Sequence, residues 1–282
     1  MTQNKFTHLL SRLLTPPATA CLACGRTSRA ESPYAGVCRS CAGAIPWIRN
    51  PRCTICGRHV GCPDCCRNGE EPEQSLFRNR SAVAYNDEMR NWLAQLKYRG
   101  DERYAPVLAA MMMPAYRLLQ EEMGRLTIGA ALNGVNGTRT RSGGFNWKAD
   151  ALVPVPVSAA RLAERGFNQA QKLAETLSSR EGIPLLPLLK RTHHTDKQSF
   201  KTRAERMSNM KDAFCLERQA VVILLRSLAA KTPASASPVQ IVIVDDIYTT
   251  GSTLRACAKV IREGAEQAGV QVQVTSVTWA RS

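Results

Sequence analysis

Eight cysteines near the beginning of the chain fall into four pairs, with two residues between the members of each pair. The pairs are Cys21/Cys24, Cys38/Cys41, Cys53/Cys56 and Cys62/Cys65. This spacing forms a tight turn in which both sulfur atoms can face one ion, and two such turns complete a tetrahedral Zn²⁺ site. Four thiolate ligands leave no open coordination position. The sequence therefore predicts two structural zinc ions and no catalysis by them.

The spacing leaves the assignment of pairs to ions open. The first two pairs can share one ion and the last two another, or the pairs can interleave. Gly25 and Gly57 each follow a pair directly, where a glycine suits the turn. Cys66 is surplus to both sites. Disulfide bonds are the alternative, but no secretion signal is visible in the first twenty residues, and the cytosol keeps thiols reduced.

A second chemical signal begins with the apolar run from Ile241 to Val244 and continues directly into Asp245 and Asp246. The run predicts a buried strand, and acids at its carboxyl end lie where open α/β sheets bind ligands. The residues after the acids supply hydroxyl groups, close backbone approach and amides at the start of a helix, which together suit a phosphate. They are Thr249, Thr250, Gly251, Ser252 and Thr253.

The elements that must position these residues alternate along the chain. Strands are expected at 78–85, 151–154, near 185, near 221, at 240–244 and at 270–278. Helices are expected from about 89 to 100, at 103–120 with a break at Pro114, at 159–179 and at 252–267. Alternating helices and continuously apolar strands predict an α/β fold with a mostly parallel sheet covered on both faces.

Two domains are expected from this pattern. Residues 1–70 would form a double zinc ribbon, and residues 71–282 the α/β domain, with an acidic linker at 70–73. Segments 124–149 and 229–238 show no hydrophobic period and are expected to be surface insertions.

The formal net charge of +15 favours polyanionic partners such as nucleic acids or phosphate-rich ligands. Residues 188–211 are strongly basic and are expected to form a mobile loop over the pocket; His193 and His194 are interpreted as ordinary residues of that loop. No run of eighteen uncharged apolar residues occurs. We therefore expect a cytoplasmic protein without a membrane span, and the composition excludes wholesale disorder.

The segment from Asp245 to Thr253 resembles the signature of type I phosphoribosyltransferases, which bind 5-phosphoribosyl 1-diphosphate (PRPP) with magnesium. The resemblance implies that Asp245 and Asp246 hold the ribose hydroxyls and, as the catalytic acids, support positive charge on the ribose. It also implies that residues 249–253 wrap the 5′-phosphate.

Other segments resemble the ComF family of phosphoribosyltransferase-like proteins. They include Val153–Ser158, the following residues from Arg161 to Gln169, and Lys97–Asp101. The resemblance implies a type I phosphoribosyltransferase-like domain behind a zinc-binding head, and a link to the uptake of single-stranded DNA. Pro154 fixes a loop where a diphosphate can lie, and Arg161 and Arg165 are candidates to bind that diphosphate; exposed helix charges are the alternative for the two arginines.

Three functions are compatible with the sequence. The first is an enzyme that displaces diphosphate from Mg-PRPP by a nitrogen nucleophile. The second is a module that binds single-stranded DNA and keeps the PRPP-type pocket as a sensor or phosphate site; Trp47, Tyr98, Phe167 and Phe200 are its candidates for base stacking. The third is an adaptor whose zinc head docks a helicase or a DNA-uptake protein.

Overall fold

The computed structural model describes residues 19–28, 32–63, 65, 76–133, 147–192, 213–216 and 238–282. The chain forms two compact units, Met1–Ile45 and Pro46–Ser282. In the first unit, β1 (Thr19–Ala20) and β2 (Thr27–Ser28) pair antiparallel, and the short helix α2 (Arg39–Gly43) follows. The second unit contains the remaining elements.

The cysteine pairs Cys53/Cys56 and Cys62/Cys65 lie in the larger unit. From the sequence, all eight paired cysteines are expected in one domain of residues 1–70. The physical reason is a set of hydrogen bonds to the first strand of the sheet. The backbone N–H of Asn79 donates to the carbonyl of Ile55 at 2.8 Å, and its side-chain amide donates to the carbonyl of Cys56 at 3.1 Å. The buried Arg80 also donates to the carbonyl of Thr54 at 3.0 Å.

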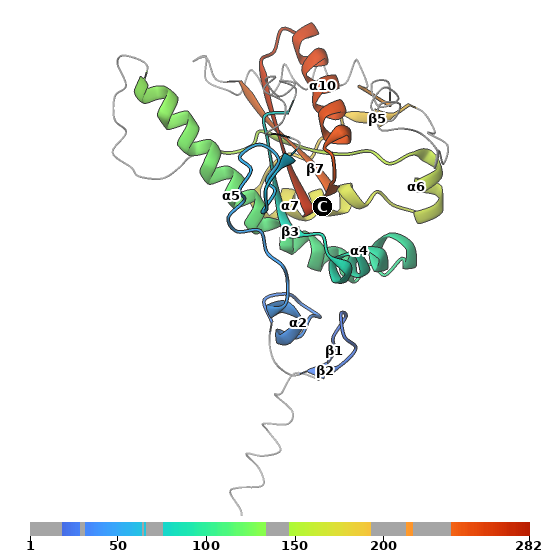
Figure 1. Ribbon diagram of the computed structural model, residues 1–282. Helices are drawn as coiled ribbons and strands as arrows, with labels where there is room; N and C mark the ends of the chain where they lie inside the picture. The colour runs from blue at the N-terminus through green and yellow to red at the C-terminus, as the bar shows by residue number, and fades with distance from the viewer. Residues whose placement is uncertain are drawn as a thin grey trace, which may run out of the picture. The chain divides into compact units, whose positions relative to one another are not determined.

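Four parallel strands form the central sheet (Figure 1). In spatial order they are β3 (Arg78–Ala84), β8 (Val272–Arg281), β7 (Val239–Tyr248) and β4 (Ala151–Pro154). Leu185 extends the β4 edge through a single parallel bridge to Leu152. These pairings confirm the predicted parallel sheet.

Helices cover both faces of the sheet. Helices α5 (Tyr104–Asn133) and α7 (Gln169–Glu181) pack against each other and against the strands on one face, and α4 (Asp87–Arg99) packs on α5. Helix α10 (Ser252–Gln267) covers the other face. Alternation along β7 explains this arrangement, because Ile241 and Ile243 pack with Leu254 and Ile261 of α10, so the side chains between them point the opposite way.

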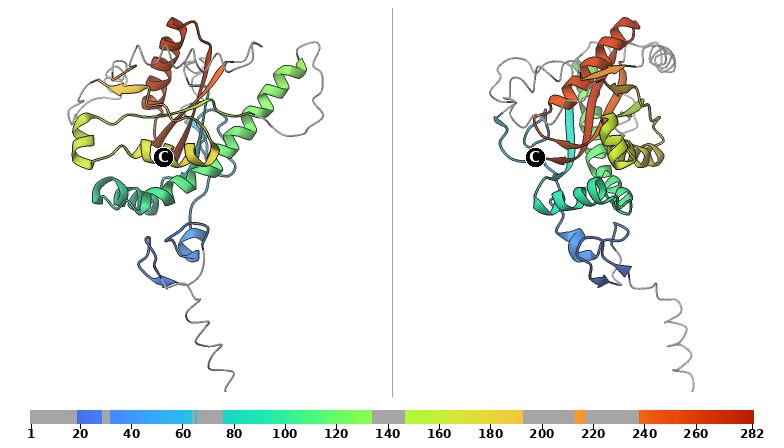
Figure 2. Two further views of the ribbon diagram at one scale, coloured as in Figure 1. Left: turned by 180° about the vertical axis from the view of Figure 1, so that it is seen from behind. Right: turned by 90° about the vertical axis from the view of Figure 1, so that its right-hand side faces the viewer.

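Helix α5 is longer than predicted and runs on past the sheet (Figure 2). It continues through Pro114 and takes in the first part of the expected insertion at 124–149. Pro114 is exposed, while Tyr116, Leu119 and Met123 beyond it are buried. Burial of this apolar face outweighs the backbone hydrogen bond that proline removes.

The single helix predicted at 159–179 is two helices, α6 (Ala159–Arg165) and α7. Gly166 ends α6 in the left-handed conformation with φ of 77°, and Asn168 then caps α7 by accepting from the N–H of Ala170 at 3.0 Å. A helix stop at Gly166 and a helix start at Asn168 therefore break the pattern.

A short antiparallel ribbon of β5 (Leu189–Arg191) and β6 (Phe214–Leu216) packs on α10. Several predicted features lie outside the described residues: most of the basic loop with His193, His194 and Phe200, the strand near Val221, Cys66, the 70–73 linker and nearly all of segment 229–238. Within the part of the chain that is described, no helix is both long and apolar enough to cross a membrane.

Candidate functional site

The sheet opens beside two acidic residues of β7. Strand β4 pairs with β7 only as far as Pro154, opposite Val244, and a last hydrogen bond joins the N–H of Val155 to the carbonyl of Val244 at 3.0 Å. Strand β7 itself continues to Tyr248 because its pairing with β8 continues, so it is longer than predicted. Asp245 and Asp246 thus lie where one neighbouring strand has already ended. The chain leaves β4 towards α7 on one face of the sheet and leaves β7 towards α10 on the other face. Open α/β sheets bind ligands at the point where two neighbouring strands lead to opposite faces.

Both acids are buried: Asp245 is 9% exposed and Asp246 is 6% exposed. The backbone N–H of Asp246 donates to the Asp245 carboxylate at 2.9 Å. Burial, and then the charge of Asp246, raise the pKa of Asp245 to about 8, because both effects disfavour its ionised form. Both effects therefore favour the protonated form of Asp245 in the free pocket.

Cationic side chains from distant segments approach the acid pair. The ammonium group of Lys97, in the last turn of α4, lies 2.5 Å from the carboxylate of Asp246. Arg191 of β5 lies close enough to Asp245 that the charge of each residue affects the pKa of the other. Burial, followed by the charge of Arg161, lowers the pKa of Arg191. The sequence included Lys97 only in a family resemblance, and Arg191 only as a member of the basic loop 188–211 expected over the pocket.

The loop between β7 and α10 presents hydroxyl groups and backbone amides. Gly251 caps α10 with φ of 79°, and a Cβ atom built there would lie 2.2 Å from the hydroxyl oxygen of Tyr248. The hydroxyls of Thr250 and Ser252 lie 3.1 Å apart, and Arg255 donates to the carbonyl of Thr250 at 2.9 Å. With no acidic residue in the first turn of α10, this helix start can receive an anion.

A second loop flanks the acids, from Pro154 to Ser158. The amide of Asn168 donates to the carbonyl of Val155 at 2.9 Å, and Ser158 caps α6 by accepting from the N–H of Arg161. The two candidate arginines have different environments. Arg161 is exposed, whereas Arg165 is half-buried, stacks on the ring of Tyr98 at 5.1 Å and donates to Gln169. They do not form an equivalent pair.

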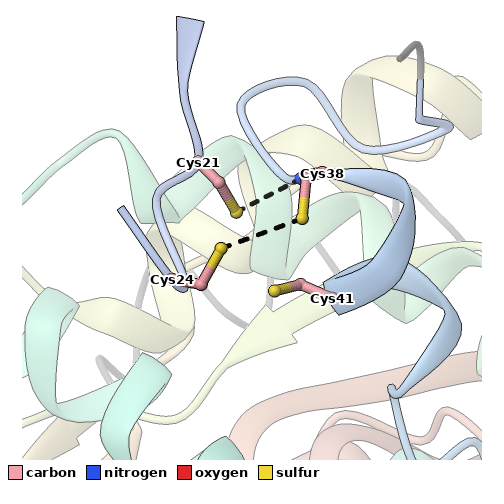
Figure 3. A group of neighbouring side chains, drawn as sticks. All are labelled: Cys21, Cys24, Cys38 and Cys41. Atoms are coloured by element: carbon pink, nitrogen blue, oxygen red, sulfur yellow. Dashed lines mark hydrogen bonds between the residues drawn. The ribbon is translucent and has the colours of Figure 1, made fainter. Parts of the chain in front are cut away.

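The first cysteine cluster consists of Cys21, Cys24, Cys38 and Cys41 (Figure 3). The sulfur atoms of Cys24 and Cys38 lie 3.9 Å apart, close to the ~3.8 Å expected for tetrahedral ligands at ~2.3 Å from zinc. The N–H of Cys38 also donates to the sulfur of Cys21. The residues therefore fit a Zn²⁺ ion.

The second cluster consists of Cys53, Cys56, Cys62 and Cys65, and the sulfur atoms of Cys56 and Cys62 lie 3.4 Å apart. Burial and the neighbouring sulfur atoms raise the pKa of Cys65, so a cation is needed to hold four thiolates together. Gly57 turns after its pair with φ of 71°. In each cluster the four sulfur atoms come from two pairs that follow each other in the sequence. The pairs are therefore grouped sequentially and do not interleave.

Two further cysteines lie outside both clusters. Cys257 is fully buried on α10, whereas Cys215 of β6 is half-buried. Of the predicted stacking residues, Tyr98 is exposed, and Trp47 and Phe167 are half-buried.

Comparison with known proteins identifies relatives of nearly full length. The competence protein ComFC of Bacillus subtilis is 31% identical over 240 residues, which cover 83% of this chain and 81% of the relative. The DNA utilization protein YhgH of Salmonella typhi is 30% identical over 84% of this chain and 88% of its own length. ComFC of Streptococcus pneumoniae is 25% identical over 86% and 93%, respectively. No protein-family model matches the sequence.

Proposed function

Because the chain belongs to the ComF family, we propose that it acts in DNA uptake and binds PRPP with Mg²⁺ at the carboxyl end of β7. The observation that carries the proposal is the position of two buried acids directly before a hydroxyl-lined loop that opens α10. Relatives named for competence and for DNA utilization support the DNA-uptake role.

The chemistry of the pocket suits both ends of a ribose phosphate. The carboxylates of Asp245 and Asp246 can accept hydrogen bonds from vicinal ribose hydroxyls. The loop from Thr249 to Thr253 offers hydroxyl and amide donors to the 5′-phosphate. The Pro154 loop and Arg161 are the proposed partners of the diphosphate. Magnesium that arrives with PRPP would offset the diphosphate charge.

Calorimetric titration of the zinc-loaded protein with Mg-PRPP tests this proposal. Asp246→Asn should weaken binding at least about tenfold, since the amide replaces a charged acceptor and removes the partner of Lys97. Asp87→Asn is the matched control, because Asp87 is an exposed acid in the first turn of α4. Equal affinities of wild type and Asp246→Asn would refute the assignment.

A pocket that binds PRPP without transferring its ribosyl group is the second candidate, and the Lys97–Asp246 ion pair favours it. Transfer would develop positive charge on the ribose next to these acids. Lys97 already neutralises one of them with an ammonium group at 2.5 Å. An assay for released diphosphate, with nucleobases, amines and DNA ends as acceptors, separates the two: release supports a transferase, and binding without release supports a sensor.

Single-stranded DNA is the proposed macromolecular ligand. Tyr98 is 68% exposed on α4 and carries Arg165 against its ring, so its free face can stack on a base beside the pocket. We expect Tyr98→Ala to weaken binding of a short oligonucleotide roughly tenfold. Unchanged affinity would favour the adaptor role, in which the first unit docks a protein such as a helicase or uptake component.

A further inference from the structure

The second cysteine cluster and the phosphate-binding loop share one buried side chain, Arg281 at the end of β8. Its guanidinium donates through Nη2 to the sulfur of Cys56 at 3.4 Å. Through Nη1 it donates to the carbonyl oxygens of Tyr248 at 3.1 Å and Thr249 at 2.9 Å, and also to the backbone oxygen of Ser282. One rigid, planar group therefore joins a cluster ligand to the two residues that begin the loop.

The surroundings of Arg281 call for a negative partner. The side chain is 2% exposed, its Cζ atom lies 4.5 Å from the centre of the Tyr248 ring, and its Nε has no hydrogen-bond partner among the described residues. A buried guanidinium is costly unless it is paired. Four thiolates around Zn²⁺ carry about two negative charges in total, so the metal-loaded cluster places negative charge at Nη2, while Nη1 is hydrogen-bonded to backbone oxygens.

The contacts on the other side of Arg281 fix the loop backbone. The carbonyl of Tyr248 accepts from Arg281 and also from the N–H of Ser282 at 3.0 Å. The Tyr248 ring packs in the same core cluster as Cys53 and Cys56, and its hydroxyl limits the space at Gly251. Holding these carbonyls in place orients the amides and hydroxyls that follow them.

We propose that Arg281 is a positioning residue that couples metal loading of the second cysteine cluster to the order of the 249–253 loop. When the cluster holds its metal, Arg281 is anchored and the loop is set for a phosphate group. When the metal is lost, Arg281 loses the negative charge at its Nη2, and the loop loosens. The ligand rests on the proposed function, but the coupling itself rests only on the contacts of Arg281.

Hydrogen exchange of the ligand-free, zinc-loaded protein tests the coupling directly. We expect amides of the 249–253 loop to exchange about ten times faster in Arg281→Met, with unchanged protection of β4 and α7. Arg281→Lys keeps the charge but has a single donor group, so we expect a smaller increase, about threefold. If Arg281→Met does not fold, Arg281→Lys decides, and wild-type exchange in a folded variant overturns the proposal.

A matched pair of cysteine variants separates the two clusters. Cys65→Ser alters the second cluster and Cys41→Ser the first; both residues are half-buried and are the last ligand of their cluster. Each should lose about one zinc ion per chain, and only Cys65→Ser should speed exchange in the loop. In Arg281→Met, Cys65→Ser should add no further increase. Equal loosening by Cys41→Ser and Cys65→Ser would overturn the coupling.

Linkage provides a second readout that involves PRPP. If the cluster and the loop are coupled, Mg-PRPP must slow extraction of one of the two zinc ions by a chelator, and Arg281→Met must abolish that protection. Should wild-type protein bind no PRPP in the calorimeter, the proposed function fails. The exchange experiment still decides the coupling, so the two failures are distinguishable.

Discussion

At the scale of single residues, the charges of Asp245 and Asp246 depend on groups that come together only in the folded chain. Asp245 and Asp246 are neighbours in sequence, but burial makes two adjacent negative charges unfavourable. Lys97 relieves Asp246, while Asp245 keeps a raised pKa of about 8. The free pocket therefore favours a protonated Asp245, whereas the proposed contact with a ribose hydroxyl uses the carboxylate.

Binding of Mg-PRPP should depend on pH as a result. The ordinary pKa of 3.8 is raised to about 8, so Asp245 binds a proton in the free folded protein throughout this interval. If the bound sugar requires the carboxylate, binding releases that proton, and affinity rises by up to about tenfold per pH unit until about pH 8. Calorimetry in buffers of different ionisation enthalpy measures the released proton. Asp245→Asn should show no such dependence; a pH-independent wild type would contradict the account.

At the scale of elements, the strand, loop and helix from β7 to α10 build the proposed phosphate site around one tight turn. Gly251 combines positive φ with close approach to the Tyr248 hydroxyl. An alanine there would be strained by its backbone and would displace the ring of Tyr248 or the loop. The same loop must then lose its arrangement of donors.

Gly251→Ala should reduce PRPP affinity at least about tenfold, with a modest loss of thermal stability of about 1 kcal/mol. The matched control is Gly269→Ala. Gly269 has φ of 71° but no atom within 4 Å of an added Cβ, so it carries the backbone strain without the collision. Titration of both variants with Mg-PRPP measures the difference. Equal affinities of the two variants would show that the loop tolerates the added methyl group.

Local patterns made most of these elements predictable. The apolar run before Asp245 and the hydroxyl-rich loop lie on consecutive residues, and the helix α10 matches its predicted bounds of 252–267. Two cysteines separated by two residues likewise form a knuckle locally. Lys97 and Arg281 were not predictable in this way, because each reaches its partner only through packing between distant segments. Segment 124–133 was misassigned because it shows no clear hydrophobic period, although helix α5 continues through it.

At the scale of the whole molecule, the two cysteine clusters belong to different compact units. The second is hydrogen-bonded to β3 through Asn79 and Arg80, so it is part of the scaffold of the sheet. Cys56→Ser should therefore lower the melting temperature of the larger unit by roughly 10 °C and release one zinc ion. Cys38→Ser should also release one zinc ion but leave that melting transition unchanged. Calorimetric scans with zinc analysis check both; equal shifts would show that the clusters stabilise one common unit.

The net charge of +15 acts over the entire surface, and its effect is best measured through salt. Each phosphate contact with single-stranded DNA releases counterions, so the logarithm of the binding constant should fall linearly with the logarithm of salt concentration, by about 0.7 per contact. Arg26 and Arg39 are exposed basic residues beside the first cysteine cluster. If that unit contacts the strand, the double substitution Arg26→Ala and Arg39→Ala should lower the slope by about 1.4. The same substitutions at Lys172 and Lys259, which lie on α7 and α10 of the larger unit, should leave it unchanged. An unaltered slope in the arginine variant would assign DNA contact to the larger unit and leave the first unit free for a protein partner.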